Sequence, residues 1–505
     1  MEGNLLFVGG DLSGIQKFIY NITSKRAMVS LKGRSHYLKT LTEKVCNDIL
    51  DIPEISHSKF SCDEMKIYCS GGKFYLQVPD TESIRNTIAD IRNKTEETLW
   101  KVHQGQLSIN IDYVPFVYDG DQVKVDGETG NIGLLWTKIT EKFNALKNQK
   151  FKFLLLDQYQ DFFEPQKVGG KVEVCQITGI EGATEYTFNF KDSDGEKQDV
   201  LTILPSVKEQ IDLGLKLRDK QHFKMLEEYA DGTYLGVLRM DVDGLGARFI
   251  KGFESMEKYK DFSGKLDKFF DADKGNLHTI QEQYKEHLNI VYAGGDDIFV
   301  VGRWEKVIEF ADDVRTQFAA YCKDVLNDAT LSISGGIAIV NAKYPIAKAA
   351  ELAGEAEDAA KKYRKEKNAF NMFGEIVSWN GEFDYVKSYK EQFVALIGKC
   401  GLSRGILHKI MIYAAIVKEN KTIEEENKNG NDKRKPNMSY LWHTAYYLTR
   451  FMGKEKNNRV VYDFCKDLRD KQLVKTDNYR LVSLAARWAE LELREIKVII
   501  NNKNV

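Results

Sequence analysis

Three carboxylates with the spacing of a metal-dependent phosphoryl-transfer site lie at two points of the 505-residue sequence. Asp241 follows the apolar run 234–240, which is predicted to be a buried strand. Asp296 and Asp297 lie at the tip of a predicted hairpin with strands near 289–293 and after 297. In a βαββαβ sheet the first strand lies beside the hairpin strands. We therefore expect the three carboxylates to converge at one edge of that sheet.

Clustered carboxylates repel one another unless a cation compensates for their charge. Hard oxygen ligands suit Mg²⁺ or Mn²⁺, and two such ions can activate a hydroxyl and stabilise a leaving pyrophosphate. Gly294 and Gly295 precede the acids and would let the backbone approach a phosphate, because they lack a Cβ. The alternative is that Gly-Gly-Asp-Asp is only a polar hairpin turn. The Asp-x-Asp at 241–243, about fifty residues earlier, favours the functional interpretation.

The order strand, helix, hairpin, helix, strand occurs twice, so the sequence contains an internal repeat. The segment 7–15 aligns with 237–245, and the segment 68–74 aligns with 291–297. The first Asp and the Gly pair are 60 residues apart (71 − 11) in the first copy and 53 residues apart (294 − 241) in the second. Each copy fits the ferredoxin-like βαββαβ unit.

Only the second copy keeps its carboxylates. The first copy has Ser13 where the second has Asp243, and Lys73 where the second has Asp296. We therefore expect the metal-binding side chains in the second copy and regard the first copy as degenerate.

The fold class predicted from these patterns is α+β, with two ferredoxin-like βαββαβ domains, an inserted domain and an α-helical bundle at the C-terminus. The predicted bounds are 1–150 for the first copy, 151–230 for the inserted linker domain, 231–380 for the second copy and 381–505 for the bundle. Apolar residues at helical spacing support the bundle. A polar segment at 418–437 within it is predicted to be a loop.

Composition excludes two classes of protein. With 73 Lys+Arg against 75 Asp+Glu the net charge is −2, which excludes a strongly basic nucleic-acid wrapper, and 11% aromatic residues exclude a wholly disordered chain. Seven cysteines without a Cys-x-x-Cys pair indicate a reducing compartment. The sequence shows no signal-peptide pattern and no apolar run approaching 18 residues. We therefore expect a cytoplasmic protein without membrane contact.

Taken together, these motifs resemble those of the large, polymerase-like subunit of type III CRISPR effector complexes (the Cas-ten family), in its Csm branch of type III-A systems. The similarity is firm over the two copies and extends to the remainder only by order and length. Gly-Gly-Asp-Asp alone would not separate this family from diguanylate cyclases. The stretches that carry the resemblance are 10–20, 31–35, 238–246, 292–297, 344–346 and 349–353.

The resemblance implies a degenerate first Palm domain, a linker domain, a catalytic second Palm domain of the GGDEF or cyclase type, and a helical bundle. It also implies a nucleotidyltransferase activity in which ATP is converted into cyclic oligoadenylate messengers when the complex binds target RNA. The implied partners are a small helical subunit, the subunit that binds the 5′ end of the guide, the guide crRNA and the target RNA.

The resemblance also assigns the metal site. Asp241, Asp296 and Asp297 would hold the Mg²⁺ or Mn²⁺ ions and carry catalysis, and the Val242 carbonyl would assist. Asp243 would be either a further ligand or a residue that supports the ligands.

The nucleotide contacts implied by the resemblance lie in both copies. One ATP would bind at the second Palm, beside Gly294 and Gly295, and the other near Ser13 and Gly14 of the degenerate Palm. Lys367 would either contact a triphosphate or be a solvated helix end.

Two features depart from the family pattern. Members commonly begin with an HD-type nuclease domain, but here the first Palm begins at residue 5 and none of the eight histidines is followed by Asp. We therefore do not expect the DNase activity of fuller members. Many members also carry a zinc site with Cys ligands in the linker domain. Only Cys175 lies in residues 150–230, so a four-Cys site is excluded there and no zinc is expected.

Two alternative functions stay open. One is a diguanylate-cyclase-like enzyme that uses GTP, although the motif ends in Asp297 rather than Glu and two fused Palms are unusual for cyclases. The other is a non-catalytic scaffold subunit of an RNA-guided complex. The intact carboxylates argue against a scaffold, because an unused acidic cluster is electrostatically costly.

Overall fold

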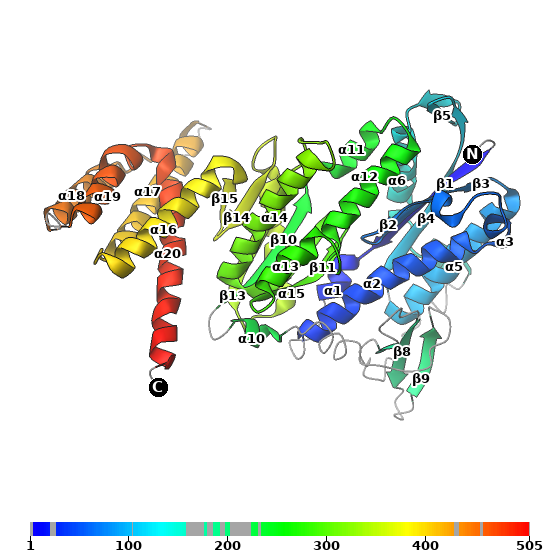
Figure 1. Ribbon diagram of the computed structural model, residues 1–505, viewed down its shortest axis with the longest axis horizontal. Helices are drawn as coiled ribbons and strands as arrows, with labels where there is room; N and C mark the ends of the chain where they lie inside the picture. Colours follow the sequence, from blue (N-terminus) through cyan, green and yellow to red (C-terminus); the bar gives the residue numbers. More distant parts are fainter. Residues whose placement is uncertain are drawn as a thin grey trace. The chain divides into compact units, whose positions relative to one another are not determined.

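The computed structural model describes residues 4–20, 27–103, 105–157, 176–178, 185–191, 197–202, 224–230, 234–428, 434–454 and 458–503. The chain divides into two compact units, residues 1–357 and 358–505 (Figure 1). The first unit holds two large sheets with their helices, and the second is mainly helical. This confirms the predicted α+β class with a helical C-terminal region. Over the described residues, no helix has the length and apolar character required to cross a membrane.

The first sheet has the strand order β2-β3-β1-β4-β5-β6. Its central strand β1 pairs antiparallel with β3 on one side and with β4 on the other. The strands are β1 (Leu5–Ser13), β2 (Lys66–Ser70), β3 (Lys73–Pro79), β4 (Ser108–Asp119), β5 (Gln122–Val125) and β6 (Glu128–Gly130). The helices are α1 (Ile15–Tyr20), α2 (Ala27–Leu50), α3 (Pro53–Ser56), α4 (Cys62–Met65), α5 (Glu82–His103), α6 (Gly133–Lys147) and α7 (Lys152–Asp157).

Both faces of β1 are buried. Leu6 and Val8 belong to the core shared with α2 and α5, whereas Leu5 and Phe7 belong to a second core that contains Trp136 of α6. Burial on both faces explains why this strand is continuously apolar in the sequence instead of alternating.

In the first unit the second sheet has the strand order β11-β12-β10-β13. Its central strand β10 pairs antiparallel with β12 and β13, which repeats the arrangement of β1 with β3 and β4. The strands are β10 (Tyr234–Val242), β11 (Leu288–Gly294), β12 (Asp297–Arg303) and β13 (Ile333–Asn341). The helices are α11 (Leu245–Lys251), α12 (Met256–Phe270), α13 (Asn276–Tyr284), α14 (Trp304–Asp324) and α15 (Ile346–Lys362).

The two copies contact each other reciprocally. Helix α2 of the first copy packs against β11 of the second, and α12 of the second copy packs against β2 of the first. Each hairpin is therefore covered by a helix of the other copy, and this brings the two Gly-Gly turns to a shared interface.

The predicted linker domain, residues 151–230, lies largely outside the described residues. Within it the structure describes α7, a three-stranded antiparallel sheet in the order β7-β8-β9, and a short helix. These elements are β7 (Gln176–Thr178), β8 (Glu185–Lys191), β9 (Lys197–Thr202) and α10 (Leu226–Ala230).

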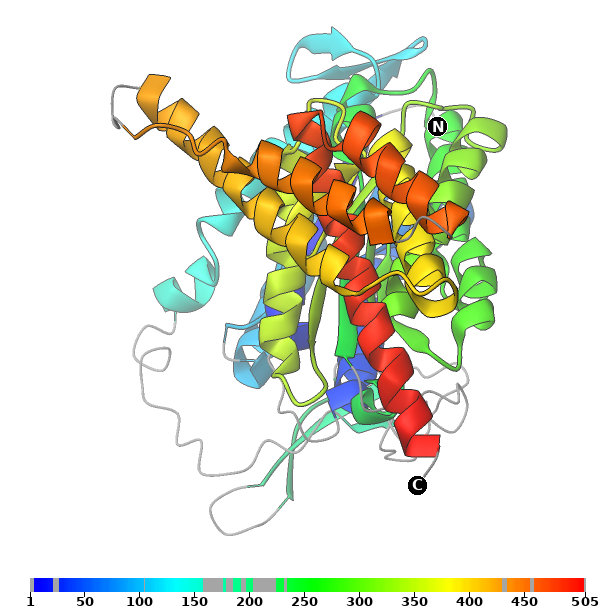
Figure 2. The same cartoon turned by 90° about the vertical axis from the view of Figure 1, so that its left-hand side faces the viewer.

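In the second unit a hairpin precedes the helices, and the long helix α20 packs against both α16 and α17 (Figure 2). Phe370 of the hairpin stacks on Trp379, with ring centroids 4.6 Å apart, and Phe383 meets both rings edge-on. The elements are β14 (Ala369–Met372), β15 (Glu375–Ser378), the π-helical turn η1 (Trp379–Phe383), α16 (Asp384–Lys399), α17 (Gly405–Lys428), α18 (Ser439–Lys454), α19 (Arg459–Asp467), η2 (Leu468–Gln472) and α20 (Thr476–Lys503).

The loop predicted at 418–437 begins later than expected. Helix α17 continues to Lys428, so the prediction was wrong for residues 418–428. Lys and Glu are good helix formers even where no apolar face recurs, and Val417, Asn420 and Ile423 keep one side of this extension buried.

Candidate functional site

The ends of two neighbouring strands place Asp241 and Asp297 side by side. In the antiparallel register of β10 and β12, Asp241 is the direct partner of Asp297. The turn that precedes β12 is closed by main-chain hydrogen bonds: the Asp296 N–H donates to the Gly294 carbonyl (2.9 Å), and the Val242 N–H donates to the Asp296 carbonyl (3.2 Å). Strand pairing thus fixes the separation of the two carboxylates.

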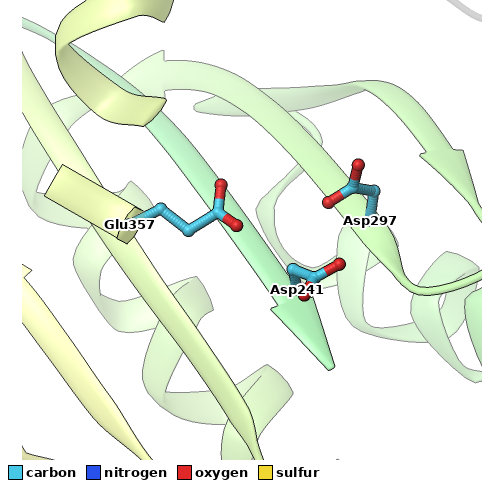
Figure 3. A group of neighbouring side chains, drawn as sticks. All are labelled: Asp241, Asp297 and Glu357. Carbon is cyan, nitrogen blue, oxygen red and sulfur yellow. The ribbon is translucent and has the colours of Figure 1, made fainter. Parts of the chain in front are cut away.

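A third carboxylate joins them from a helix that the sequence analysis did not connect with the site. Glu357 of α15 lies with Asp241 and Asp297, and one carboxylate oxygen of each lies within 4.8 Å of the others. Figure 3 shows the three side chains coming from β10, β12 and α15. We call these three residues the acidic trio. By contrast, Asp296 is not a member of the trio, and its predicted role as a ligand stays a prediction.

A sequence signal for Glu357 existed. The buried face of α15 is marked by Ala349, Ala350, Ala353 and Ala360, and Glu357 lies on the same face because it is four residues after Ala353 and three before Ala360. An acid among buried alanines needs a partner.

The acidic trio is electrostatically crowded. Burial raises the pKa of Asp297, and the charges of Asp296 and Glu357 raise this pKa further, whereas Arg239 and a hydrogen bond with Asp241 oppose the shift. The Arg239 guanidinium lies 3.2 Å from the Glu357 carboxylate. A crowded set of carboxylate oxygens of this kind fits a hard divalent cation such as Mg²⁺ or Mn²⁺.

The Gly-Gly turns of the two copies lie against each other. A Cβ built on Gly294 would be 2.9 Å from the Gly71 Cα, and a Cβ built on Gly71 would be 2.9 Å from the Gly294 carbonyl oxygen. Gly71 and Gly295 also have left-handed backbones (φ 60° and 67°). The sequence analysis explained the glycines by the approach of a phosphate. The structure adds a separate reason, which is that the two turns can meet only if neither carries a side chain there.

Comparison with known proteins matches both large sheets to family models. The family described as "Cas10/Cmr2, second palm domain" matches residues 234–371, and the one described as "Csm1 subunit domain B" matches residues 4–167. A relative from Enterococcus italicus, named CRISPR system single-strand-specific deoxyribonuclease Cas10/Csm1 (subtype III-A), is 27% identical over 440 residues. The chain is a homologue of the Cas10/Csm1 proteins. The match covers 75% of this chain but 55% of that relative, so the chain spans about half the length of the relative.

Solved structures of Csm1 share the fold. A Csm1–Csm4 cassette in complex with pppApA has a TM-score of 0.66 and 20% identity over 97% of this chain and 69% of that chain. A Csm1–Csm4 cassette in complex with cA4 has a TM-score of 0.61 and 22% identity over 96% of this chain and 70% of that chain. We therefore call the first sheet with its helices the first Palm and the second sheet with its helices the second Palm.

In the second Palm, Asp243 has a different environment from Asp241. Its side chain is buried, and the hydroxyls of Ser332 and Ser334 donate hydrogen bonds to its Oδ2 at 2.7 and 2.8 Å. Its own N–H donates to the Ser332 carbonyl. These bonds tie the end of β10 to the start of β13, which favours the supporting role over the ligand role that the sequence left open.

One lysine of the first Palm replaces an acid of the second: Lys73 pairs with Asp11 as Asp297 pairs with Asp241, so the strand register puts it at the place of Asp297 and not of Asp296 as the sequence alignment predicted. Asp11 of β1 occupies the place of Asp241 and is paired in register with Lys73, and the Lys147 ammonium lies 2.7 Å from the Asp11 carboxylate. Burial acts to lower the pKa of Lys73, but charges that include those of Asp296 and Asp11 outweigh it, and the pKa is raised. Two lysines of the first Palm thus lie around Asp11, and the charge of Lys73 also acts on Asp296 of the second Palm.

The predicted nucleotide contacts of the first Palm, Ser13 and Gly14, lie where β1 meets α1. The Asn110 side-chain amide donates to the Ser13 hydroxyl (2.9 Å). Gly14 is left-handed (φ 92°), and a Cβ there would be 2.1 Å from the Gln106 carbonyl oxygen. Lys367, the predicted triphosphate contact, belongs to the second unit, where it follows α15 with a left-handed backbone (φ 55°).

A cavity of about 280 Å³ opens beside the two turns. Its walls come from α2, from the end of α12 and from both Gly-Gly turns. Several titratable side chains line it, and three of them have pKa values shifted mainly by burial. Burial lowers the pKa of Lys32 to about 8 and that of His36 to about 4, and burial raises the pKa of Asp267 to about 7. Sequence reasoning missed this cavity, because its walls are contributed by both copies.

Proposed function

We propose that this chain is the nucleotidyltransferase subunit of a type III-A CRISPR complex and converts ATP into cyclic oligoadenylates when target RNA is bound. The acidic trio carries this proposal, because it places three carboxylates at the strand ends of the second Palm. The shared strand order of the two sheets supports a ferredoxin-like assignment for both Palms. Related Csm1–Csm4 cassettes were solved in complex with pppApA and with cA4.

The proposed reaction joins two ATP molecules. The 3′-hydroxyl oxygen of one attacks the α-phosphorus of the other, a phosphodiester bond forms, the bond to pyrophosphate breaks, and the hydroxyl proton passes to solvent. The same step within a linear product closes the ring. Asp241, Asp297 and Glu357 would hold the divalent cations, with Asp296 at the same turn. A bound cation lowers the pKa of the attacking hydroxyl and neutralises the leaving pyrophosphate.

The interface between the Palms suits two nucleotides. The acidic trio of the second Palm favours the ATP whose α-phosphate is attacked. On the other side Lys73 and Lys147 provide positive charge, which favours the triphosphate of the second ATP. Holding both reactants in line supplies roughly 7–11 kcal/mol of rate acceleration in well-oriented systems.

The 280 Å³ cavity is the proposed pocket for a nucleobase. The cavity extends to both glycine turns, so a nucleotide with its base in the cavity would have its ribose and phosphates near the turns. Lys32 is a donor there, and Asp267, whose pKa is raised to about 7, can present either a carboxylate or a protonated carboxyl to the base edge. The nucleotide contacts proposed for Gly294, Gly295, Ser13 and Gly14 complement this pocket. The triphosphate contact of Lys367, in the second unit, stays a prediction.

We further propose that the chain assembles with a Csm4-type subunit that binds the 5′ end of the guide, with a small helical subunit, and with crRNA and target RNA. The support is the similarity to Csm1 in the cassettes, because those structures contain Csm4.

Mass spectrometry of the products of the assembled complex tests the proposal. With ATP, Mg²⁺ and target RNA we expect cyclic oligoadenylates, and we expect none without target RNA or in the presence of EDTA. Asp241→Asn and Asp297→Asn should abolish synthesis but leave assembly and RNA binding unchanged. Product from GTP but not ATP would favour the diguanylate-cyclase alternative. Normal assembly without any nucleotide product would favour the scaffold.

A further inference from the structure

Arg239 lies beside the acidic trio and forms an ion pair with one of its members. It lies on β10 two residues before Asp241, so both side chains are on the same face of the sheet. One guanidinium nitrogen, Nη2, lies 3.2 Å from Glu357, and the other, Nη1, donates to the side-chain oxygen of Gln16 in α1 of the first Palm at 3.2 Å. The ion pair is buried, with 13% of the Arg239 side chain and 3% of the Glu357 side chain exposed.

The surroundings make room for this guanidinium. A Cβ on Gly354, one turn before Glu357 on α15, would be 2.5 Å from the Arg239 Nη1. The charge of Arg239 also acts on Asp297 and on Tyr20 of the first Palm. The guanidinium therefore interacts with two members of the trio and contacts the first Palm.

The buried carboxylate of Glu357 needs a positive charge nearby. A buried carboxylate without a counter-ion is strongly destabilising, so Glu357 depends on Arg239 when no metal ion is bound. A divalent cation among the three carboxylates would supply the same positive charge at the same place. Arg239 and the cation would then repel each other across a few ångströms, where screening by solvent is weak.

We propose that Arg239 is the counter-ion of the metal-free acidic trio: it stabilises Glu357 until a divalent cation binds, and its charge weakens the binding of the bare ion. The inference rests on the proposed function, in which the trio is the metal site. Arg239 thus positions Glu357 in the metal-free site. Its positive charge also disfavours metal binding until a nucleotide contributes negative charge of its own. Its hydrogen bond to Gln16 keeps the guanidinium at the first Palm when Glu357 turns to the ion.

Binding of Mn²⁺ to the full 505-residue chain tests the proposal, with free Mn²⁺ measured by electron paramagnetic resonance. Arg239→Met should bind Mn²⁺ at least about tenfold more tightly than the unchanged chain, because one repelling charge is gone. Without metal the variant should melt at a lower temperature, and Mn²⁺ should restore most of the loss. Arg239→Lys keeps the charge and should bind Mn²⁺ nearly as the unchanged chain does.

Arg248→Met is the matched control. Arg248 of α11 forms an ion pair with Asp328 (2.9 Å) and takes no part in the trio. Its loss should lower the melting temperature, but neither the Mn²⁺ affinity nor the recovery by Mn²⁺ should change. If Arg239→Met is folded and binds Mn²⁺ equally or more weakly, Arg239 is not the counter-ion and the inference fails.

Two further variants separate this inference from the proposed function. Asp297→Asn should weaken Mn²⁺ binding, and if it does not, the trio is not the metal site and the proposed function fails with the inference. If Asp297→Asn weakens binding but Arg239→Met does not tighten it, only the inference fails. Should Arg239→Met not fold, Glu357→Gln is compared with the double variant Arg239→Met, Glu357→Gln, in which both buried charges are absent. The double variant should bind Mn²⁺ more tightly than Glu357→Gln, and equal or weaker binding refutes the inference.

Discussion

Replacing Gly71 with Ala should disable the site without unfolding the protein. The new Cβ would lie 2.9 Å from the Gly294 carbonyl oxygen, 3.0 Å from the Gly294 carbonyl carbon and 3.1 Å from the Gly295 nitrogen. All three are backbone atoms of the opposite turn, so no side chain can rotate away. Ordinary contact begins near 3.4 Å, and the two turns must therefore separate by about 0.5 Å.

The magnitude has two parts. Gly71 has a left-handed backbone (φ 60°), which costs Ala about 1 kcal/mol. Forced separation of two packed turns adds about 1–3 kcal/mol. The free energy of unfolding should therefore fall by about 2–4 kcal/mol. Gly120 is the matched control, because it is also left-handed (φ 63°) and a Cβ there meets no atom within 4 Å. Gly120→Ala should cost only about 1 kcal/mol.

Activity should separate the two variants more clearly than stability. The turn opposite Gly71 leads directly into Asp296 and Asp297. A misplacement of reacting groups by about 1 Å can cost about 10²-fold in rate, which is the upper limit of the loss expected here. The assay is oligoadenylate synthesis by the assembled, target-bound complex at saturating ATP, at a temperature where circular dichroism shows both variants folded. If Gly71→Ala keeps as much activity as Gly120→Ala, the meeting of the turns does not position the site.

Three further predictions concern single features. Asp243→Asn should lower oligoadenylate synthesis by about tenfold, whereas Asp241→Asn should abolish it. The Asp243 variant only weakens hydrogen bonds at the end of β10 and removes no carboxylate of the trio. Equal losses of the steady-state rate in the two variants would make Asp243 a ligand. Burial, and then the charge of Arg34, lowers the pKa of His103 to about 3 from an ordinary 6.5, so the unfolded chain binds more protons between these values and stability falls as pH drops through this window. His103→Gln, which retains a partner for the Tyr37 hydroxyl, should flatten that fall in denaturant titrations at pH 7 and pH 5, and an unchanged pH dependence would contradict the assignment. Because none of its eight histidines is followed by Asp, the 505-residue chain should not degrade single-stranded DNA, and metal-dependent cleavage by the purified chain would contradict this prediction.

The pairing of Asp241 with Asp297 could be predicted from the sequence. A hairpin is a local structure, and in a βαββαβ unit the first strand lies next to the hairpin. The apolar runs and turn residues are therefore sufficient to predict that these two carboxylates are neighbours. The internal repeat and the α+β class follow from the same local patterns. The sequence also showed that the copies differ, since Lys73 stands where the second copy has an acid.

Helix orientation was less predictable. Apolar spacing predicted helices in the C-terminal bundle, and α18 (Ser439–Lys454) is one of them. The spacing did not show which face is buried, and the large side chains Trp442 and Tyr446 are 60% and 62% exposed. An aromatic stripe has the same spacing whether it packs against a core or faces outward, so the sequence cannot distinguish the two cases.

Only the tertiary structure decided which distant groups complete the site. Glu357 reaches the trio because α15 packs its alanine face onto the second sheet, and Lys147 reaches Asp11 from the last turn of α6. Neither contact can be predicted from the spacing of residues in the sequence. Each depends on the orientation in which a helix packs on a sheet whose strands lie many residues away. The contact of Gly71 with Gly294 depends likewise on the packing of one copy against the other. Residue patterns along the chain determine the strands and turns. Which cation neutralises a buried carboxylate depends on how separate helices and strands pack together, so the tertiary structure is needed to show it.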